Sequence, residues 1–169
     1  MTPLRSLPDI PDGSYVFIDA NIFVYGLNTA SVQCEQLLQR CSREEVNGIR
    51  LYEIVNEATH RFMVQEAFSK GIITRSTAAH LRNRYDLIPG LTDYWTKTEM
   101  LLDLNLLFLS TDESIVRRAQ SERQTYGLLT NDSMILSCMH RYGISFLATS
   151  DEDFERVSDI VVFRPDDLP

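Results

Sequence analysis

Residues 15–19 read YVFID, and this short stretch decides the interpretation of the fold. Four consecutive apolar side chains are typical of a strand that is buried on both faces, because helices cover both sides of a parallel sheet. Similar apolar runs at Leu106–Leu109 and Ile144–Ala148 predict two more buried strands. A last run, Ile160–Phe163, predicts an edge strand, and Ile49–Tyr52 is long enough only for a brief strand.

The segments between these runs have the spacing of helices. Apolar residues at positions 34, 37, 38 and 41 predict an amphipathic helix over residues 31–46, which Asn47-Gly48 can end. A long helix is expected over residues 53–69, and residues 74–103 are expected to form a helical insertion or lid, interrupted at Pro89-Gly90. Strands that alternate with helices indicate an α/β fold with a central, mostly parallel sheet of four to five strands and helices on both faces.

Two further helices have recognisable ends. The residues Ser110-Thr111-Asp112-Glu113 match a capping box and predict a helix that runs to about residue 126. Thr130 or Asn131 can cap a helix over residues 132–141, and Gly143 can end it.

Length and charge limit the possible functions. The 169 residues suit one domain, expected over residues 15–163 after a lead-in at residues 1–14. The net charge of −8 argues against binding of nucleic acid through lysines and arginines alone, so a nucleic-acid substrate would require bound cations.

Three cysteines without a C-x-x-C pair suit reduced thiols. With no signal-peptide pattern and no long apolar run, we expect a cytoplasmic protein without a membrane segment.

Acidic side chains follow the predicted strands at the edge of the sheet where ligands bind in α/β folds. Asp19 directly follows the first strand, Asp151 comes three residues after the strand that ends at residue 148, and Asp132 lies in the first turn of its helix. Glu57 lies one turn into the long helix, and Glu53 lies on the same helix face, so either glutamate could supply a fourth carboxylate.

Clustered carboxylates suit Mg²⁺ or Mn²⁺, which prefer oxygen ligands. Each acid alone has a simpler explanation: Asp19 and Asp132 as helix caps, Glu57 as part of a solvated helix face, and Asp151 in an Asx-turn. Their joint placement at one edge favours a metal site.

Four stretches resemble, in order and spacing, the acidic motifs of PIN-domain ribonucleases. They read FIDANIFVYGL (residues 17–27), IVNEATHRFM (54–63), TNDSMILSCMHRYG (130–143) and FLATSDEDFERV (146–157). The sequence is most similar to the VapC-type toxins of prokaryotic toxin–antitoxin pairs, over residues 15–163. This resemblance implies a PIN-like three-layer sandwich.

The resemblance also implies a function and its residues. It implies metal-dependent hydrolysis of RNA phosphodiester bonds, with an RNA substrate, an antitoxin partner and a homodimer. The metal-binding acids would be Asp19, Glu57, Asp132 and Asp151. Asn21 would orient Asp19, Thr149 or Ser150 would assist near the scissile phosphate, and Asp153 would be a fringe acid. A metal that activates a water makes a covalent nucleophile unnecessary.

Other enzyme classes have less support. The sequence contains neither a G-x-S-x-G elbow nor a Walker loop. His60, His80 and His140 fall on predicted helices, where packing roles are expected rather than zinc ligation. A phosphotransfer receiver domain would need a lysine after a later strand, and no lysine follows Phe108.

A binding module is the main alternative from another functional class. In that case the acidic pocket of a PIN-like domain would dock a basic partner segment, and metal-dependent RNA cleavage would separate the two functions. The arginines at positions 61, 82, 84, 117 and 118 could hold phosphates, but scattered charges on helices usually form a solvated face.

Overall fold

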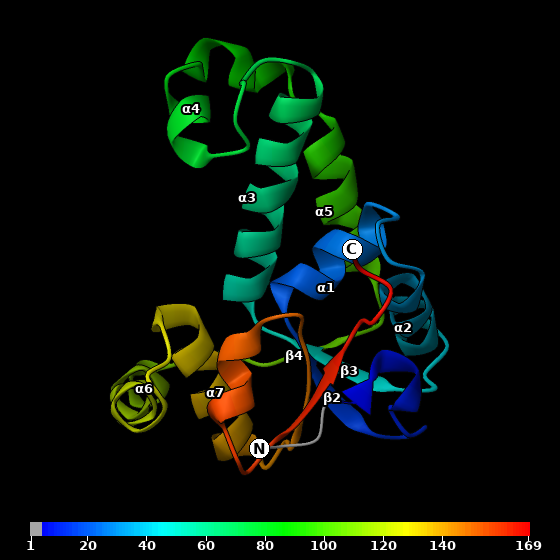
Figure 1. Ribbon diagram of the computed structural model, residues 1–169, viewed down its shortest axis with the longest axis vertical. Helices are drawn as coiled ribbons and strands as arrows, with labels where there is room; N and C mark the ends of the chain where they lie inside the picture. The colour runs from blue at the N-terminus through cyan, green and yellow to red at the C-terminus, as the bar shows by residue number, and fades with distance from the viewer. Residues whose placement is uncertain (1–4) are drawn as a thin grey trace.

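The computed structural model describes residues 5–169 and contains one sheet of six strands, all of them parallel to their neighbours (Figure 1). The strand order is β1-β6-β5-β2-β3-β4. The strands are β1 (Arg5–Ser6), β2 (Tyr15–Ile18), β3 (Asn47–Arg50), β4 (Leu107–Phe108), β5 (Phe146–Ala148) and β6 (Val161–Arg164). Because β2 lies between β5 and β3, the carboxyl end of β2 opens near the middle of one sheet edge.

Helices flank this sheet, as expected for an α/β fold. Helix α1 packs against α2, α6 packs against α7, and the long α3 runs beside α5 (Figure 1). The α-helices are α1 (Ala20–Leu27), α2 (Val32–Ser42), α3 (Tyr52–Ser69), α4 (Ala78–Arg82), α5 (Asp93–Asp103), α6 (Glu113–Tyr126) and α7 (Thr130–Tyr142). Three 3-10 helices complete the described chain, η1 (Leu7–Asp9), η2 (Tyr85–Gly90) and η3 (Glu152–Arg156).

The third strand begins earlier than the sequence predicted. Helix α2 ends at Ser42, and Asn47-Gly48 opens β3 instead of ending a helix. A Cβ atom at Gly48 would overlap Leu106 Cδ2 and would lie 2.8 Å from Cys41 Sγ. Glycine is therefore required here so that β3 can approach its neighbours.

The edges of the sheet also differ from the prediction. Ile160–Phe163 was expected at an edge, but β1 pairs with the outer side of β6. Arg5 and Ser6 of the expected lead-in thus join the sheet, and Leu7 and Ile10, which follow, are buried in the core. Residues 1–4 lie outside the described chain. The prediction of a buried strand at Leu106–Leu109 was wrong, because β4 is a two-residue edge strand in which Leu107 is 49% exposed.

Two helix starts differ from their predicted caps. The capping-box prediction at Ser110 was wrong, because Asp112 caps α6 and accepts a hydrogen bond from the Ile115 backbone NH at 3.1 Å. Helix α7 begins at Thr130 without a side-chain cap, so the predicted Thr130 or Asn131 cap was also wrong. Asn131 lies inside the first turn, where its side chain donates to another helix, as described below.

The apolar side chains form a large core and a smaller one. The large core includes the three cysteines, which are buried free thiols as the sequence predicted. The smaller core joins Val64, Ala67, Ile73, Leu81 and Leu91, and it holds α4 and the turns around it against the far end of α3. Within residues 5–169, no helix has both the length and the apolar character needed to cross a membrane.

Candidate metal centre

Asp19 lies where β2 ends and α1 begins, and its carboxylate is held by three hydrogen bonds. The Ala20 backbone NH donates to Oδ1 at 2.7 Å, as in a helix cap. The Asn21 Nδ2 amide and the Thr149 hydroxyl each donate to Oδ2 at 2.7 Å. Asp19 therefore caps helix α1, which was the simpler explanation for it, and it is also part of a buried polar network.

This network ties the loop after β5 to the start of α1. The Thr149 hydroxyl accepts from Asn21 Nδ2 at 3.1 Å and from the Asp151 backbone NH at 3.0 Å. The Ser150 backbone NH donates to Asn21 Oδ1 at 3.0 Å. Thr149 is fully buried beside Asp19, so the structure places it where it can orient Asp19 and Asp151.

Three carboxylates come together beside this network. One oxygen each of Asp132, Asp151 and Asp153 lies within 4.8 Å of the others. Asp132 is in the first turn of α7, and Asp151 caps η3, its Oδ1 accepting from the Asp153 backbone NH at 2.8 Å. Asp151 thus does form an Asx-turn, the simpler explanation given for it, and this turn brings Asp153 into the group. The resemblance had implied only a fringe position for Asp153.

The charges of this centre act strongly on one another. Burial, together with the charges of Asp151, Asp19, Asp153 and Glu57, raises the pKa of Asp132 from 3.8 to about 7. Burial also raises the pKa of Asp19 from 3.8 to about 6, against the lowering effect of its hydrogen bonds from Thr149 and Ala20. The fold therefore concentrates negative charge in a place where a counter-charge would be stabilising.

The structure distinguishes the two glutamates of α3. Glu57 Oε2 accepts a hydrogen bond from Asn131 Nδ2 at 3.0 Å, and the charge of Glu57 raises the pKa of both Asp19 and Asp132. Glu53 is exposed and accepts a hydrogen bond from the Thr111 hydroxyl. Glu57 therefore faces the acidic group, although it lies outside the three acids whose oxygens are within 4.8 Å.

The donor set fits a hard divalent cation. All the converging side chains offer carboxylate oxygens, which Mg²⁺ and Mn²⁺ prefer, and no histidine or cysteine belongs to the described group. His140 lies toward the other end of α7, with Nδ1 2.9 Å from Glu122 Oε1 and Nε2 2.9 Å from Asp159 Oδ2, and it is not part of the acidic group.

Comparison with known sequences identifies the family. The PIN domain matches residues 16–160, which is most of the chain. The chain belongs to the PIN-domain family. Two curated relatives come from Methanocaldococcus jannaschii. Ribonuclease VapC6 is 28% identical over 163 residues, covering 89% of this chain and 97% of the relative, and Ribonuclease VapC2 is 24% identical over 142 residues, covering 84% and 88%.

Solved structures of VapC proteins share the fold of this PIN-domain chain. The crystal structure of VapBC2 from Rickettsia felis bound to a DNA fragment from their promoter aligns with a TM-score of 0.59 and 15% identity, covering 90% of this chain and 99% of the other. VapC20 from Mycobacterium tuberculosis, a Sarcin-Ricin loop cleaving toxin, aligns with a TM-score of 0.56 and 11% identity, covering 86% and 96%. At these identities the likeness establishes the fold.

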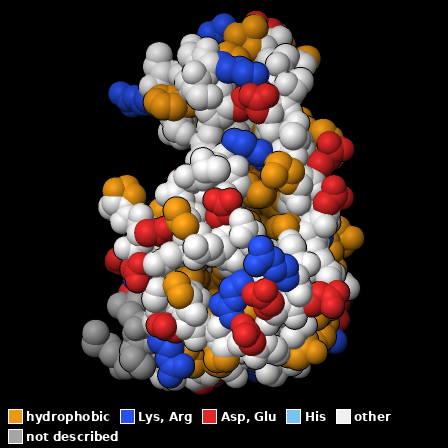
Figure 2. Space-filling model, turned by 90° about the vertical axis from the view of Figure 1, so that its right-hand side faces the viewer, with side chains coloured by type: hydrophobic (Ala, Val, Ile, Leu, Met, Phe, Trp, Pro, Cys, Tyr) orange, Lys and Arg blue, Asp and Glu red, His pale blue; other side chains and the backbone are white. Residues whose placement is uncertain are grey.

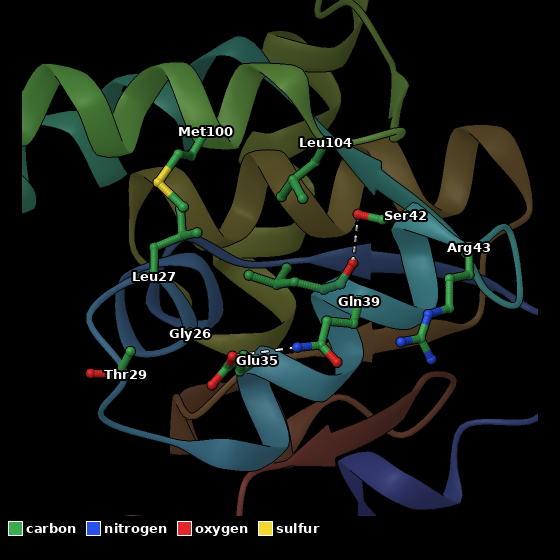
Figure 3. Close-up of a pocket in the computed structure, with 10 residues that line it drawn as sticks. Gly26, Leu27, Thr29, Glu35, Gln39, Ser42, Arg43, Met100 and Leu104 are labelled. Atoms are coloured by element: carbon green, nitrogen blue, oxygen red, sulfur yellow. Dashed lines mark hydrogen bonds between the residues drawn. The ribbon is translucent and has the colours of Figure 1, made fainter.

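A separate hollow of about 330 Å³ lies between α1, α2 and α5 and contains none of the clustered acids (Figure 3). Leu27, Leu38, Met100 and Leu104 contribute apolar surface to it. At its base Gly26 lets α1 approach α2, because a Cβ atom there would lie 2.8 Å from Leu38 Cδ1. The hollow lies between helices and is distinct from the acidic centre.

Proposed function

We propose that this PIN-domain chain is a Mg²⁺- or Mn²⁺-dependent ribonuclease of the VapC type, which hydrolyses RNA phosphodiester bonds and has an antitoxin as its partner. The observation that carries the proposal is the convergence of Asp132, Asp151 and Asp153 within 4.8 Å, beside the network that fixes Asp19. Two relatives that match nearly end to end are named ribonucleases, which supports this choice of reaction.

The chain's own residues would divide the work as follows. Asp132, Asp151 and Asp153 would hold the cation where their oxygens converge, and Asp19 and Glu57 would be the acids beside them. Asn21 and Thr149 would keep the Asp19 carboxylate in place, since each donates to its Oδ2. Mg²⁺ or Mn²⁺, when bound, supplies Lewis-acid activation of a water and stabilises charge at the phosphate.

Electrostatics gives a reason for the metal requirement. Without a cation the clustered carboxylates repel an RNA phosphate, because all of them carry the same sign of charge as the substrate. The cation therefore has to neutralise the centre before the scissile phosphate can enter it. This requirement agrees with the net charge of −8, which leaves little general attraction for RNA.

The same comparisons support the proposed partner. Matching structures include a toxin–antitoxin complex from Klebsiella pneumoniae, aligned with a TM-score of 0.54 and 19% identity, covering 86% of this chain and 95% of the other. We propose that an antitoxin binds this chain and that the chain forms a homodimer. Co-purification with the product of an adjacent reading frame and light scattering of the purified protein test the two statements separately.

Cleavage of RNA by the purified protein tests the proposed reaction. We expect cleavage with added Mn²⁺ or Mg²⁺, none in EDTA, and a loss of at least about a hundredfold for Asp151→Asn, in line with the loss of a metal ligand. Glu152→Gln is the matched control, because Glu152 is the next residue, its side chain is 80% exposed and its Oε1 lies 3.5 Å from Arg164 Nη2. Undiminished cleavage in excess chelator would overturn the proposal.

The same experiment decides the alternative of a non-catalytic module. If the parent protein with Mn²⁺ cleaves no RNA but binds a basic peptide, and Asp151→Asn abolishes that binding, the acidic centre serves as a docking site for a partner. RNA cleavage that needs both Mn²⁺ and Asp151 excludes this alternative.

A further inference from the structure

The far half of α3, together with α4 and η2, forms a basic projection, here called the arm (residues 60–91; top of Figure 1). The arm carries five of the chain's 16 lysines and arginines but only two of its 24 acids. Figure 2 shows lysine and arginine side chains around this projection, with a hollow separating it from a body that carries many acidic side chains. The arm therefore has the opposite charge to the rest of the molecule.

The arginines of the arm have no carboxylate partners. Among residues 5–169, no carboxylate lies within 4.0 Å of the charged nitrogens of Arg61, Arg75, Arg82 or Arg84, and the last three side chains are exposed. In the body, by contrast, seven of the ten arginines are paired with acids: Arg40, Arg43, Arg117, Arg118, Arg141, Arg156 and Arg164. Arg84 Nη1 also donates to the Ile72 backbone carbonyl at 3.3 Å. Guanidinium groups without a carboxylate partner are available to bind phosphate through paired hydrogen bonds.

The arm is held at a fixed position relative to the acidic centre. Its own apolar core packs against α3, which also carries Glu57. The buried carboxylate of Glu66 accepts from the Thr92 and Tyr94 backbone NH groups at 2.9 and 2.8 Å and from Lys70 Nζ at 2.5 Å. These bonds join the start of α5 to the end of α3, so the two ends of the arm are tied together.

A pocket on the arm lies on the face of α3 that carries Glu57. It has a volume of about 270 Å³ and is lined by His60, Arg61, Val64, Gln65, Ser76 and Ala78. His60, Arg61 and Val64 follow Glu57 at i+3, i+4 and i+7, the spacing of one helix face. A nucleic-acid strand that leaves the acidic centre along this face would meet Arg61 first and then the loop that carries Arg75.

We propose that the arm is the surface that binds the RNA backbone next to the cleavage site, with Arg61 and His60 taking a phosphate in this pocket and Arg75, Arg82 and Arg84 contacting phosphates farther along. The choice of RNA as ligand rests on the ribonuclease function proposed above. The arm thereby supplies the cationic contacts that the acidic centre cannot. It would bind RNA of any sequence, because phosphates carry no sequence information.

Binding of a short fluorescent single-stranded RNA in EDTA tests the arm without cleavage. The variants are Arg61→Gln alone and the triple variant Arg75→Gln/Arg82→Gln/Arg84→Gln. The matched control removes three arginines from the body, Arg43→Gln/Arg117→Gln/Arg123→Gln. Thermal melts of all variants verify that they fold.

We expect the triple arm variant to bind RNA at least about tenfold more weakly and the body control to change little. The slope of log affinity against log salt should fall by about 0.7 for each phosphate that the variant no longer neutralises. With Mn²⁺ present, cleavage of a long RNA should fall through a higher KM, while hydrolysis of an RNA with a single phosphodiester should be unchanged because it is too short to reach the arm.

Three outcomes would overturn the proposal. Equal losses in the arm and body variants would show that only net charge matters. An unchanged salt slope would show that the arm contacts no phosphate. Arm variants that keep RNA affinity but lose binding to poly-glutamate would assign the arm to an acidic protein partner. If the parent cleaves no RNA but its binding depends on the arm, the ribonuclease function fails while the binding surface stands.

Discussion

Replacing Asp132 by asparagine should stabilise the metal-free protein at neutral pH, although most substitutions of ordered residues destabilise by ~0.5–3 kcal/mol. Burial and neighbouring carboxylates raise the pKa of Asp132 from 3.8 to about 7. At about 1.36 kcal/mol per pKa unit, this rise corresponds to about 4 kcal/mol of unfolding free energy. Asp132 is only partly buried, so solvent screening reduces the figure, and we expect about 2 kcal/mol.

The sign of the effect depends on pH. Because the folded-state pKa of Asp132 is raised, protonation stabilises the folded metal-free parent below the unfolded pKa of 3.8, and this contribution is lost as the pH rises through about 7. The Asp132→Asn variant lacks this group. Its advantage over the parent should therefore be absent near pH 4 and complete above about pH 7.

Thermal melts of both proteins in EDTA and in Mn²⁺ measure these differences. For a chain of this length, 2 kcal/mol corresponds to a rise in Tm of about 4–8 °C. Mn²⁺ at about 100 times its Kd should add about 2.7 kcal/mol to the parent and much less to Asp132→Asn. Glu152→Gln, which removes an exposed charge from the same surface, controls for net charge.

A strongly destabilised Asp132→Asn variant that keeps the full Mn²⁺ gain would refute the reasoning. That result would mean that Asp132 stabilises the fold as part of the first turn of α7 and does not hold the metal. Equal gains in Asp132→Asn and Glu152→Gln would mean that the effect comes from net charge and not from the cluster.

Three further predictions concern the same structure. Glu57→Gln should lower the RNA cleavage rate at least about tenfold, because Glu57 faces the acidic group. Glu53→Gln should have little effect, because Glu53 is exposed and bonds to Thr111. The reverse result would show that Glu53, and not Glu57, belongs to the site. Calorimetry should show that Mn²⁺ affinity falls as the pH drops below about 7, where Asp132 takes up a proton, and falls again below about 6, where Asp19 does. An affinity that does not depend on pH would contradict this prediction. Gly48→Ala should destabilise by about 1–3 kcal/mol in denaturant unfolding because its Cβ would meet the core, whereas Gly90→Ala, with no atom within 4 Å of its Cβ, should not.

Much of the candidate site could be predicted from the sequence because two of its acids come just after the ends of strands in the chain. The apolar run of β2 fixes where the strand stops, and Asp19 is the next residue. The parallel sheet then brings the loop after β5, with Asp151, to the same edge. Both inferences depend only on local periodicity and on the direction of the strands.

Other features depend on tertiary contacts that periodicity cannot reveal. Glu53 and Glu57 share a helix face, so only the hydrogen bond from Asn131 distinguishes them. Asp153 enters the acidic group because a turn at Asp151 folds it back. Strand β1 has two residues, too few for any pattern, and it exists because β6 offers a free edge.

The charge pairing of the arginines is another feature that the sequence could not reveal. The sequence places arginines at positions 61, 82 and 84 on helices, as it does those at 117 and 118. In the structure the last two pair with acids one turn away on α6, and the first three have no carboxylate partner among the described residues. Pairing, and not position on a helix, separates a solvated face from a candidate phosphate-binding surface.

The most direct test of the proposed metal centre is the anomalous scattering of a crystal of the full chain soaked in Mn²⁺. We predict a peak between the carboxylates of Asp132 and Asp151, within reach of Asp19, and its loss in crystals of Asp132→Asn. A soaked crystal with no peak at these acids, or with its only peak at another group such as Glu122, His140 and Asp159, would contradict the account.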